Sequence, residues 1–141
     1  MADRNARATW QGDLFKGRGT VTAVSSGLFT DAEVSWAART EAAEGATSPE
    51  ELIAAAHAAC FCMAFSNELS SRGPEPARLD VEATCTFEGG KVTTIALTVQ
   101  AEVPGADDAI IAEALAAAEQ SCPVSNALRG NVDIVVTRRS A

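Results

Sequence analysis

The sequence has no tyrosine, a single histidine and few aromatic residues, which make up 5% of its 141 residues. Alanine supplies much of the apolar fraction instead: 29 residues are Ala, so large apolar side chains are few. A chain of this length corresponds to one domain, and we expect residues 1–141 to form a single domain. A core this light often needs a second subunit to complete its burial. The composition therefore favours an oligomer.

Positive charge is also scarce. Eleven Lys and Arg residues stand against 19 Asp and Glu residues, and the formal net charge is −8. Binding to nucleic acid and to anionic membranes depends on neutralising negative charge, so we expect neither as a partner. The longest apolar run, Leu52–Cys60, is far shorter than a membrane span.

An apolar segment typical of a secretory signal is not visible near the N-terminus. The sequence has only four cysteines. In the reducing cytosol such cysteines are more often catalytic, metal-bound or buried than joined in structural disulfides. We therefore expect a cytoplasmic protein whose cysteines have to be considered one at a time.

The first half of the chain predicts strands followed by one long helix. Segments rich in Thr, Val and Trp, separated by glycines, predict strands over Ala6–Gln11, Arg18–Ser25 and Glu33–Arg39. After a polar loop over Glu41–Thr47, Ser48 and Glu51 form a capping box with Pro49 at the first helical position. The helix is expected to run from Pro49 to about Ser71. Its middle is apolar nearly all round, which is typical of a helix buried on several sides.

The second half predicts a hairpin, two helices and a last strand. The expected elements are strands Leu79–Phe87 and Lys91–Val103 around Gly89-Gly90, helices Asp107–Gln120 and Ser121–Leu128, and strand Val132–Val136. This order indicates an α+β domain with helices packed on a mostly antiparallel sheet.

The four cysteines have different predicted environments. Cys60 lies in the middle of the apolar helix, and Cys62 points about 200° away from it, so a helical Cys-x-Cys pair cannot form a disulfide or chelate one metal. Alternation places Cys85 on the inner face of its strand. Cys122 falls in the first turn of a short helix, where backbone N–H groups lower a thiol pKa, although a packed core cysteine is equally consistent. The spacing of these cysteines and His57 matches no compact zinc pattern.

Two motifs resemble one known family. The segment Ser48-Pro-Glu-Glu-Leu-Ile-Ala-Ala-Ala-His-Ala-Ala-Cys60-Phe and the later Ser121-Cys-Pro-Val-Ser-Asn-Ala-Leu128 are similar to motifs of the osmotically inducible protein C / organic hydroperoxide resistance (OsmC/Ohr) family. Trp10-Gln-Gly-Asp and Gly17-Arg-Gly-Thr extend the resemblance over nearly the whole chain. His57 and the Trp10 segment resemble the OsmC branch more closely, because the Ohr branch typically has Tyr at the position of His57.

The resemblance implies a fold and an activity. The implied fold is an intertwined homodimer, with antiparallel sheets packed around long central helices. The implied activity is the reduction of organic hydroperoxides, including lipid hydroperoxides, in oxidative or osmotic stress. Cys60 would attack the peroxide and Cys122 would resolve the sulfenic acid as a disulfide. A dithiol reductant, a dihydrolipoyl group on a lipoylated protein or another thiol, would reset the pair, and no metal, haem or flavin would be needed.

An attacking thiolate in the middle of an apolar helix needs a nearby cation, because burial raises a thiol pKa. The resemblance offers Arg39, which matches the OsmC branch and which we favour, and Arg18, which matches the Ohr branch. Glu50 can hold an Arg fork while Glu51 serves the capping box. Glu50 and Cys60 are about 15 Å apart along one helix. If both serve one site, either an Arg bridges this distance or Glu50 comes from a second copy. We expect a composite site with Cys60 and Cys122 from one copy and Glu50 from the other, and either copy could supply the Arg.

Other roles remain open from the sequence. His57 shares a helix face with Cys60 and could assist it or simply be packed. Phe61, Phe65 and Trp36 could line a pocket for an alkyl group or belong to the core. The alternatives to a peroxidase are a non-catalytic dimeric binding protein and a cysteine hydrolase that uses Cys60 and His57.

Overall fold

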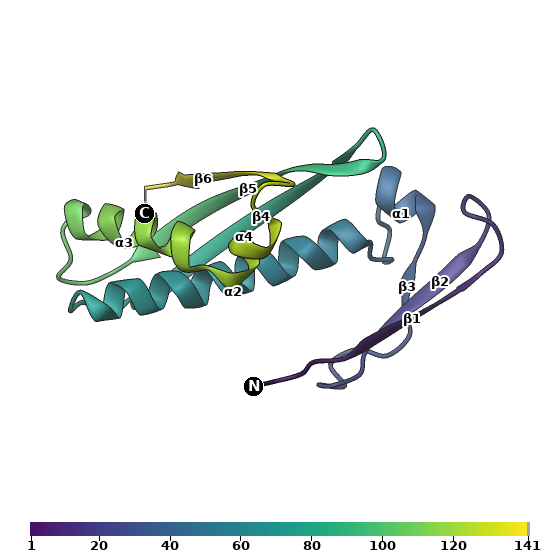
Figure 1. Ribbon diagram of the computed structural model, residues 1–141, viewed down its shortest axis with the longest axis horizontal. Helices are drawn as coiled ribbons and strands as arrows, with labels where there is room; N and C mark the ends of the chain where they lie inside the picture. Colours follow the sequence, from purple (N-terminus) through teal and green to yellow (C-terminus); the bar gives the residue numbers. More distant parts are fainter. Residues whose placement is uncertain (141) are drawn as a thin grey trace. The chain divides into compact units, whose positions relative to one another are not determined.

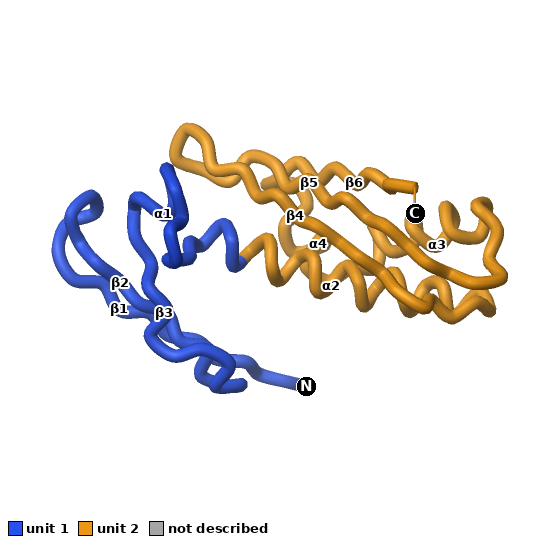
Figure 2. Tube along the Cα trace, turned by 180° about the vertical axis from the view of Figure 1, so that it is seen from behind, with its two compact units in different colours: residues 1–52 blue, residues 53–141 orange. Residues whose placement is uncertain are grey.

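The computed structural model describes residues 1–140. The chain folds into two compact units, and the boundary between them lies inside the long helix (Figure 2). The first unit covers Met1–Leu52, and the second begins at Ile53.

The first unit contains a three-stranded antiparallel sheet. Its strands are β1 (Ala6–Gln11), β2 (Arg18–Ala23) and β3 (Ala32–Val34), in that spatial order. Gly19 is in the central strand, opposite Trp10 on one side and Val34 on the other. A Cβ at Gly19 would lie 2.4 Å from Cε3 of the Trp10 ring, so only glycine allows this ring to lie across the sheet.

The predicted strand Glu33–Arg39 is wrong in its second half. β3 ends at Val34, and residues Trp36–Thr40 form a short helix, α1. The Ser35 hydroxyl accepts a hydrogen bond from the Ala38 N–H at 3.0 Å and caps this helix. Arg39 therefore lies in a helix that a serine cap begins and that two alanines favour, rather than at the end of a strand.

The long helix α2 runs over Pro49–Ser71, as the capping box predicted. The Ser48 hydroxyl accepts the Glu51 N–H at 3.2 Å. One face of α2 is fully buried through four side chains spaced four residues apart: His57, Phe61, Phe65 and Leu69. Met63, on another face, is 73% exposed. Within one chain, α2 therefore has one fully buried face and does not show the burial on several sides that the sequence predicted.

The second unit contains a mixed sheet. Strands β4 (Arg78–Glu88) and β5 (Lys91–Glu102) form the predicted hairpin, and β6 (Asp133–Arg138) pairs with β5 in parallel (Figure 1). Gly89 and Gly90 have φ values of +61° and +81°, which explains the glycine pair in the hairpin turn.

Helices α2, α3 (Asp108–Ser121) and α4 (Pro123–Leu128) supply the rest of the second unit's core. The buried apolar residues come from α2, from alternate positions of β5 and the residue after it, from α3, and from the start of α4: Phe61, Phe65, Leu69, Ile95, Leu97, Val99, Ala101, Val103, Ile111, Ala114, Ala118 and Cys122. The class is α+β, as predicted.

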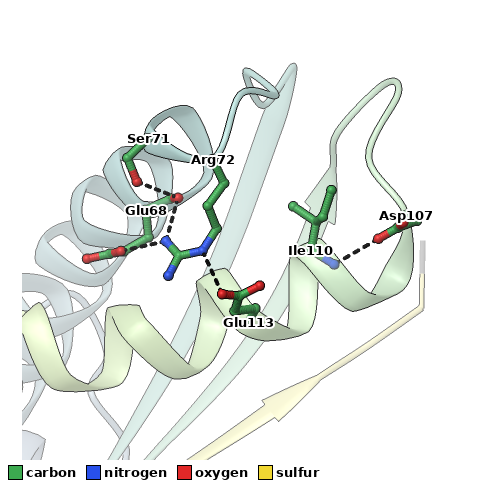
Figure 3. A network of polar contacts seen from close by, with 6 residues as sticks. All are labelled: Glu68, Ser71, Arg72, Asp107, Ile110 and Glu113. Atoms are coloured by element: carbon green, nitrogen blue, oxygen red, sulfur yellow. Dashed lines mark hydrogen bonds and ion pairs between the residues drawn. The ribbon is translucent and has the colours of Figure 1, made fainter.

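A polar network joins the end of α2 to α3 (Figure 3). The Arg72 guanidinium donates to the Glu68 carboxylate at 2.7 Å and to the Glu68 carbonyl at 2.9 Å. Its Nε forms an ion pair with Glu113 of α3 at 3.7 Å. Close by, the Asp107 carboxylate caps α3 by accepting the Ile110 N–H at 2.8 Å. These contacts fix where α2 ends and α3 begins.

α2 is long and apolar enough to cross a membrane, judged by length and composition alone. The central helix of a folded core passes the same test. Phe61, Phe65 and Leu69 of α2 are packed inside the second unit, and 22% of the apolar window is buried in one chain.

Candidate active site

The two cysteines singled out by the sequence meet in the second unit. Cys60 is half-buried in α2, and Cys122 is fully buried at the N-cap of α4. Both are thiols, and the two side chains lie close enough for each to shift the pKa of the other. Segments 62 positions apart in the sequence thus bring two sulfurs together.

Hydrogen-bond donors surround the Cys122 sulfur. The Ser125 N–H donates to Sγ at 3.5 Å, and the Ser125 hydroxyl, the Val124 N–H and the Cys60 thiol contribute further hydrogen bonds. Burial by itself raises the pKa of Cys122, but these donors outweigh it and lower that pKa below its ordinary value.

Cys60 has the opposite balance. Burial raises its pKa most, and the hydrogen bond and negative charge shared with Cys122 raise it further, against a lowering by the Val124 N–H. Within the second unit, the surroundings therefore lower the pKa of Cys122 and raise the pKa of Cys60.

His57 does not act on Cys60 directly. It is fully buried, and its Nε2 is 2.7 Å from the Ser125 hydroxyl. Its Nδ1 has no hydrogen-bond partner within residues 1–140. Burial lowers the pKa of His57, which keeps the ring neutral. The cysteine hydrolase alternative thus lacks the hydrogen bond between Cys60 and His57 that it needs.

Ser125 is the site residue to which the sequence reasoning gave no role. It is 1% exposed and contacts both His57 and Cys122. The available signal was its place in Cys122-Pro-Val-Ser125, where a serine three residues after an N-cap brings its N–H back to the capping side chain.

Arg39 and Glu50 meet in the first unit. Arg39 Nε and Nη2 both lie near Oε1 of Glu50, at 2.9 and 2.8 Å. Glu50 is buried, and its Oε2 has no hydrogen-bond partner in the described chain. The Arg39 guanidinium also lies over the Trp36 ring, 5.9 Å from its centroid. Arg18, the other candidate, opens β2 opposite Gln11 of β1.

A cavity of about 380 Å³ lies beside Arg39 in the first unit. Apolar side chains from the sheet, α1 and the start of α2 line most of it: Trp10, Leu14, Val34, Trp36 and Leu52. Trp36 thus lines a pocket, which is one of the two roles that the sequence left open for it. Phe61 and Phe65 do not: both are fully buried in the core.

The two remaining cysteines lie on the edge of the core. Cys62 is half-buried, and burial followed by the charge of Asp80 raises its pKa. Cys85 packs against the core from β4, on the inner face that alternation predicted. Within residues 1–140 no group of three or more His, Cys, Asp or Glu side chains is placed to hold a metal ion.

The family model for OsmC-like proteins matches residues 40–137, which includes both interacting cysteines, His57, Ser125 and Glu50. The chain belongs to the OsmC-like family. The resemblance stated from the motifs is thereby confirmed.

Two curated OsmC-like relatives match most of the chain. Peroxiredoxin OsmC of Escherichia coli (strain K12) is 36% identical over 135 residues, 93% of each chain. An organic hydroperoxide resistance protein of Xanthomonas axonopodis pv. citri is 34% identical and covers 82% of this chain and 83% of its own.

Among solved structures, the organic hydroperoxide resistance protein OhrB of Bacillus subtilis superposes with a TM-score of 0.67 at 27% identity. The match covers 96% of this chain and 98% of OhrB. The fold is thus that of the OsmC/Ohr proteins.

Proposed function

We propose that this OsmC-like chain is a thiol-dependent peroxidase that reduces organic hydroperoxides to alcohols in defence against oxidative or osmotic stress. The relatives named peroxiredoxin and organic hydroperoxide resistance protein support this assignment. The observation that carries it is the pairing of Cys60 and Cys122, two thiols at one edge of the apolar core that shift each other's pKa.

The proposed cycle uses the two sulfurs in turn. The Cys60 thiolate attacks the terminal oxygen of R–O–O–H and the O–O bond breaks, which gives Cys60 sulfenic acid and an alkoxide. The alkoxide takes up a proton to form the alcohol. The Cys122 thiolate then attacks the Cys60 sulfur and displaces hydroxide, which takes up a proton to form water. A dithiol such as a dihydrolipoyl group reduces the disulfide and is itself oxidised to a disulfide.

Cys60 needs help to ionise, because the surroundings of the second unit raise its pKa. We propose that the Arg39–Glu50 pair of a second copy supplies the positive charge, in a homodimer. The carboxylate of Glu50 orients the guanidinium by accepting from Nε and Nη2. Arg18 is the less favoured source, since the ion pair of Glu50 is with Arg39. The exposed apolar face of α2 around Met63 supports a second copy as its cover.

The cavity beside Arg39 supports an organic substrate. Its lining is predominantly apolar, with Trp10 and Trp36 among its walls, and it is large enough for an alkyl or aryl group. An apolar pocket favours a hydroperoxide that carries such a group over hydrogen peroxide, which has nothing to bury.

The test is the consumption of cumene hydroperoxide by the reduced protein, coupled to dihydrolipoamide, with hydrogen peroxide measured alongside. We expect faster turnover of the organic peroxide. Cys60→Ser is expected to abolish consumption. Cys122→Ser is expected to allow one fast turnover and then stop with a sulfenic acid. Cys62→Ser, a half-buried cysteine on the same helix, is the matched control and is expected to keep the wild-type rate.

Failure has a distinct signature. If the folded wild-type protein consumes neither peroxide with dihydrolipoamide or with other thiols, the peroxidase proposal is wrong. The non-catalytic binding protein then becomes the better description. Peroxide consumption that survives Cys60→Ser but is lost in Cys62→Ser would show that Cys62, and not Cys60, attacks the peroxide.

A further inference from the structure

A buried chain of polar groups connects His57 to the resolving cysteine. His57 Nε2 contacts the Ser125 hydroxyl at 2.7 Å, and Ser125 in turn donates its backbone N–H to the Cys122 sulfur at 3.5 Å. The Ser125 side chain also contributes to the lowered pKa of Cys122. His57 and Cys122 are fully buried, and Ser125 is 1% exposed. Three polar side chains gathered at the edge of an apolar core are costly unless each is satisfied.

The direction of these hydrogen bonds can be assigned from the partners available. Nδ1 of His57 has no partner within residues 1–140, and a buried N–H without an acceptor is rarer than a buried acceptor without a donor. The proton of the neutral ring is therefore assigned to Nε2, which donates to the Ser125 oxygen. The one hydroxyl proton of Ser125 is then left to donate to the Cys122 sulfur.

We propose that His57 and Ser125 are positioning residues that direct a chain of hydrogen bonds at the Cys122 sulfur and hold it as the thiolate for disulfide formation with Cys60. This inference rests on the proposed peroxidase function. His57 acts through Ser125, and neither residue touches the peroxide.

The step that this arrangement serves is balanced without a further reactant. The Cys122 thiolate forms the S–S bond as the S–O bond of Cys60 sulfenic acid breaks. The Cys122 sulfur is oxidised, the Cys60 sulfur is reduced, and the departing hydroxide takes a proton from solvent to become water. The hydrogen bonds from Ser125 raise the share of Cys122 that is ionised and aimed at Cys60.

Charged side chains contribute little to the lowered pKa of Cys122. The titratable groups that act on it are Cys60 directly and His57 through Ser125. The charged residues nearest along α3 and α4 are Glu119 and Arg129, and Arg129 donates to the Glu119 carbonyl at the surface. The facing positions of β5 are apolar. Hydrogen-bond donors, rather than a cation, thus account for the lowered pKa of Cys122.

The experiment separates the two chemical steps. The reduced full-length protein is mixed with one equivalent of cumene hydroperoxide between pH 5 and 9. Peroxide loss reports attack by Cys60. Disulfide formation, with dimedone trapping of the remaining sulfenic acid, reports resolution by Cys122. Ser125→Ala and His57→Leu are expected not to slow the first step, because less negative charge at Cys122 makes Cys60 more acidic. Both are expected to slow resolution about tenfold at neutral pH and to move its pH profile to higher pH.

Conservative variants distinguish positioning from packing. Ser125→Thr keeps the hydroxyl, and His57→Gln keeps an N–H donor near the position of Nε2, so both are expected to restore most of the resolution rate and the wild-type pH profile. Ser66→Ala, a half-buried serine on the same helix as His57, is the control and is expected to behave as wild type. Ser125→Ala removes a single oxygen and carries the test if His57→Leu does not fold.

Two results would overturn the inference: resolution by Ser125→Ala at the wild-type rate and pH profile, or equal impairment of the conservative and non-conservative variants. If the wild-type protein consumes no peroxide, the peroxidase proposal fails separately. The pH dependence of Cys122 alkylation by iodoacetamide then tests the hydrogen-bond chain alone. A profile unchanged by Ser125→Ala would refute it.

Discussion

Arg39 directs both Nε and Nη2 at one oxygen of Glu50, at 2.9 and 2.8 Å, and the second oxygen of that buried carboxylate has no partner within residues 1–140. The guanidinium is thus held at one oxygen of the carboxylate. This charge-assisted contact leads to the first prediction.

Removing the charge of Glu50 is expected to weaken the control of Arg39. Glu50→Gln keeps the size of the side chain but loses the charge-assisted hydrogen bonds, so the rate of peroxide attack at neutral pH is expected to fall about tenfold. Single-turnover peroxide consumption is the measurement. Glu51→Gln, on the same helix turn, is the control, because its carboxylate accepts only a peripheral hydroxyl from Thr47. Equal losses in both variants would indicate damage to the helix start instead.

Removing Cys122 is expected to make Cys60 more acidic. The hydrogen bond and charge of Cys122 both raise the pKa of Cys60, after the larger effect of burial. Cys122→Ala removes them, so the pKa of Cys60 falls and its alkylation by iodoacetamide at neutral pH becomes faster. Peptide mass spectrometry between pH 6 and 10 follows this. Slower alkylation of Cys60 in the variant would contradict the pairing.

Gly19→Ala is expected to destabilise the first unit. The added Cβ would lie 2.4 Å from Trp10 Cε3, a distance that forces the ring or the strand to move, at a cost of about 1–3 kcal/mol. Thermal unfolding measures this. In a Trp10→Ala background the same substitution is expected to cost much less, because the ring is gone. Additive losses would mean that the clash is with the Val34 side chain or the Thr9 carbonyl, which the same Cβ would approach to 2.9 and 3.0 Å.

Leu69→Ala is expected to cost about 2–5 kcal/mol of unfolding free energy, because the side chain is fully buried in the core. Leu28→Ala is the matched control: this leucine is 81% exposed, and its loss is expected to be within about 0.5 kcal/mol. Urea denaturation of both variants gives the comparison. Similar values for the two would show that the core assigned to α2 is incorrect.

Arg72→Gln is expected to change the acid dependence of stability. The hydrogen bond from Arg72 is the main cause of the lowered pKa of Glu68. A carboxyl whose folded pKa is depressed contributes stability above its unfolded pKa, and that stability disappears as the pH falls through the folded pKa. The variant is therefore expected to unfold more easily at pH 7 and to approach the wild type below the usual Glu range. Arg4→Gln, at the exposed N-terminus, is expected to show no such trend.

Local signals in the sequence located most elements. The start of α2 followed from Ser48, Pro49 and Glu51, and the turn of the hairpin followed from Gly89-Gly90, because caps and turns are decided by neighbouring residues. The strand predicted through Arg39 was wrong after Val34 because of another local signal. The Ser35 hydroxyl accepts the Ala38 N–H and begins a short helix, which outweighs the strand tendency of Trp36.

The site depended on contacts that no local pattern contains. His57 and Ser125 are 68 positions apart, and their hydrogen bond exists only because α4 packs beside α2. The motif around Cys122 identified the cysteine but gave no reason to connect Ser125 to a histidine on another helix. The sequence likewise left a choice between Arg39 and Arg18, and the ion pair of Arg39 with Glu50 is a contact that no local pattern indicates.

The distance along the chain between Cys60 and Cys122 has a thermodynamic consequence. A disulfide between them would close a loop of 62 residues, the chain from the middle of α2 through the hairpin and α3 to the start of α4. Loop-closure entropy would then make the oxidised form more resistant to unfolding than the dithiol form by about 4 kcal/mol. Each catalytic cycle would raise and then lower the free energy of unfolding of the second unit. The unfolding temperature would therefore report whether the cysteine pair is oxidised or reduced.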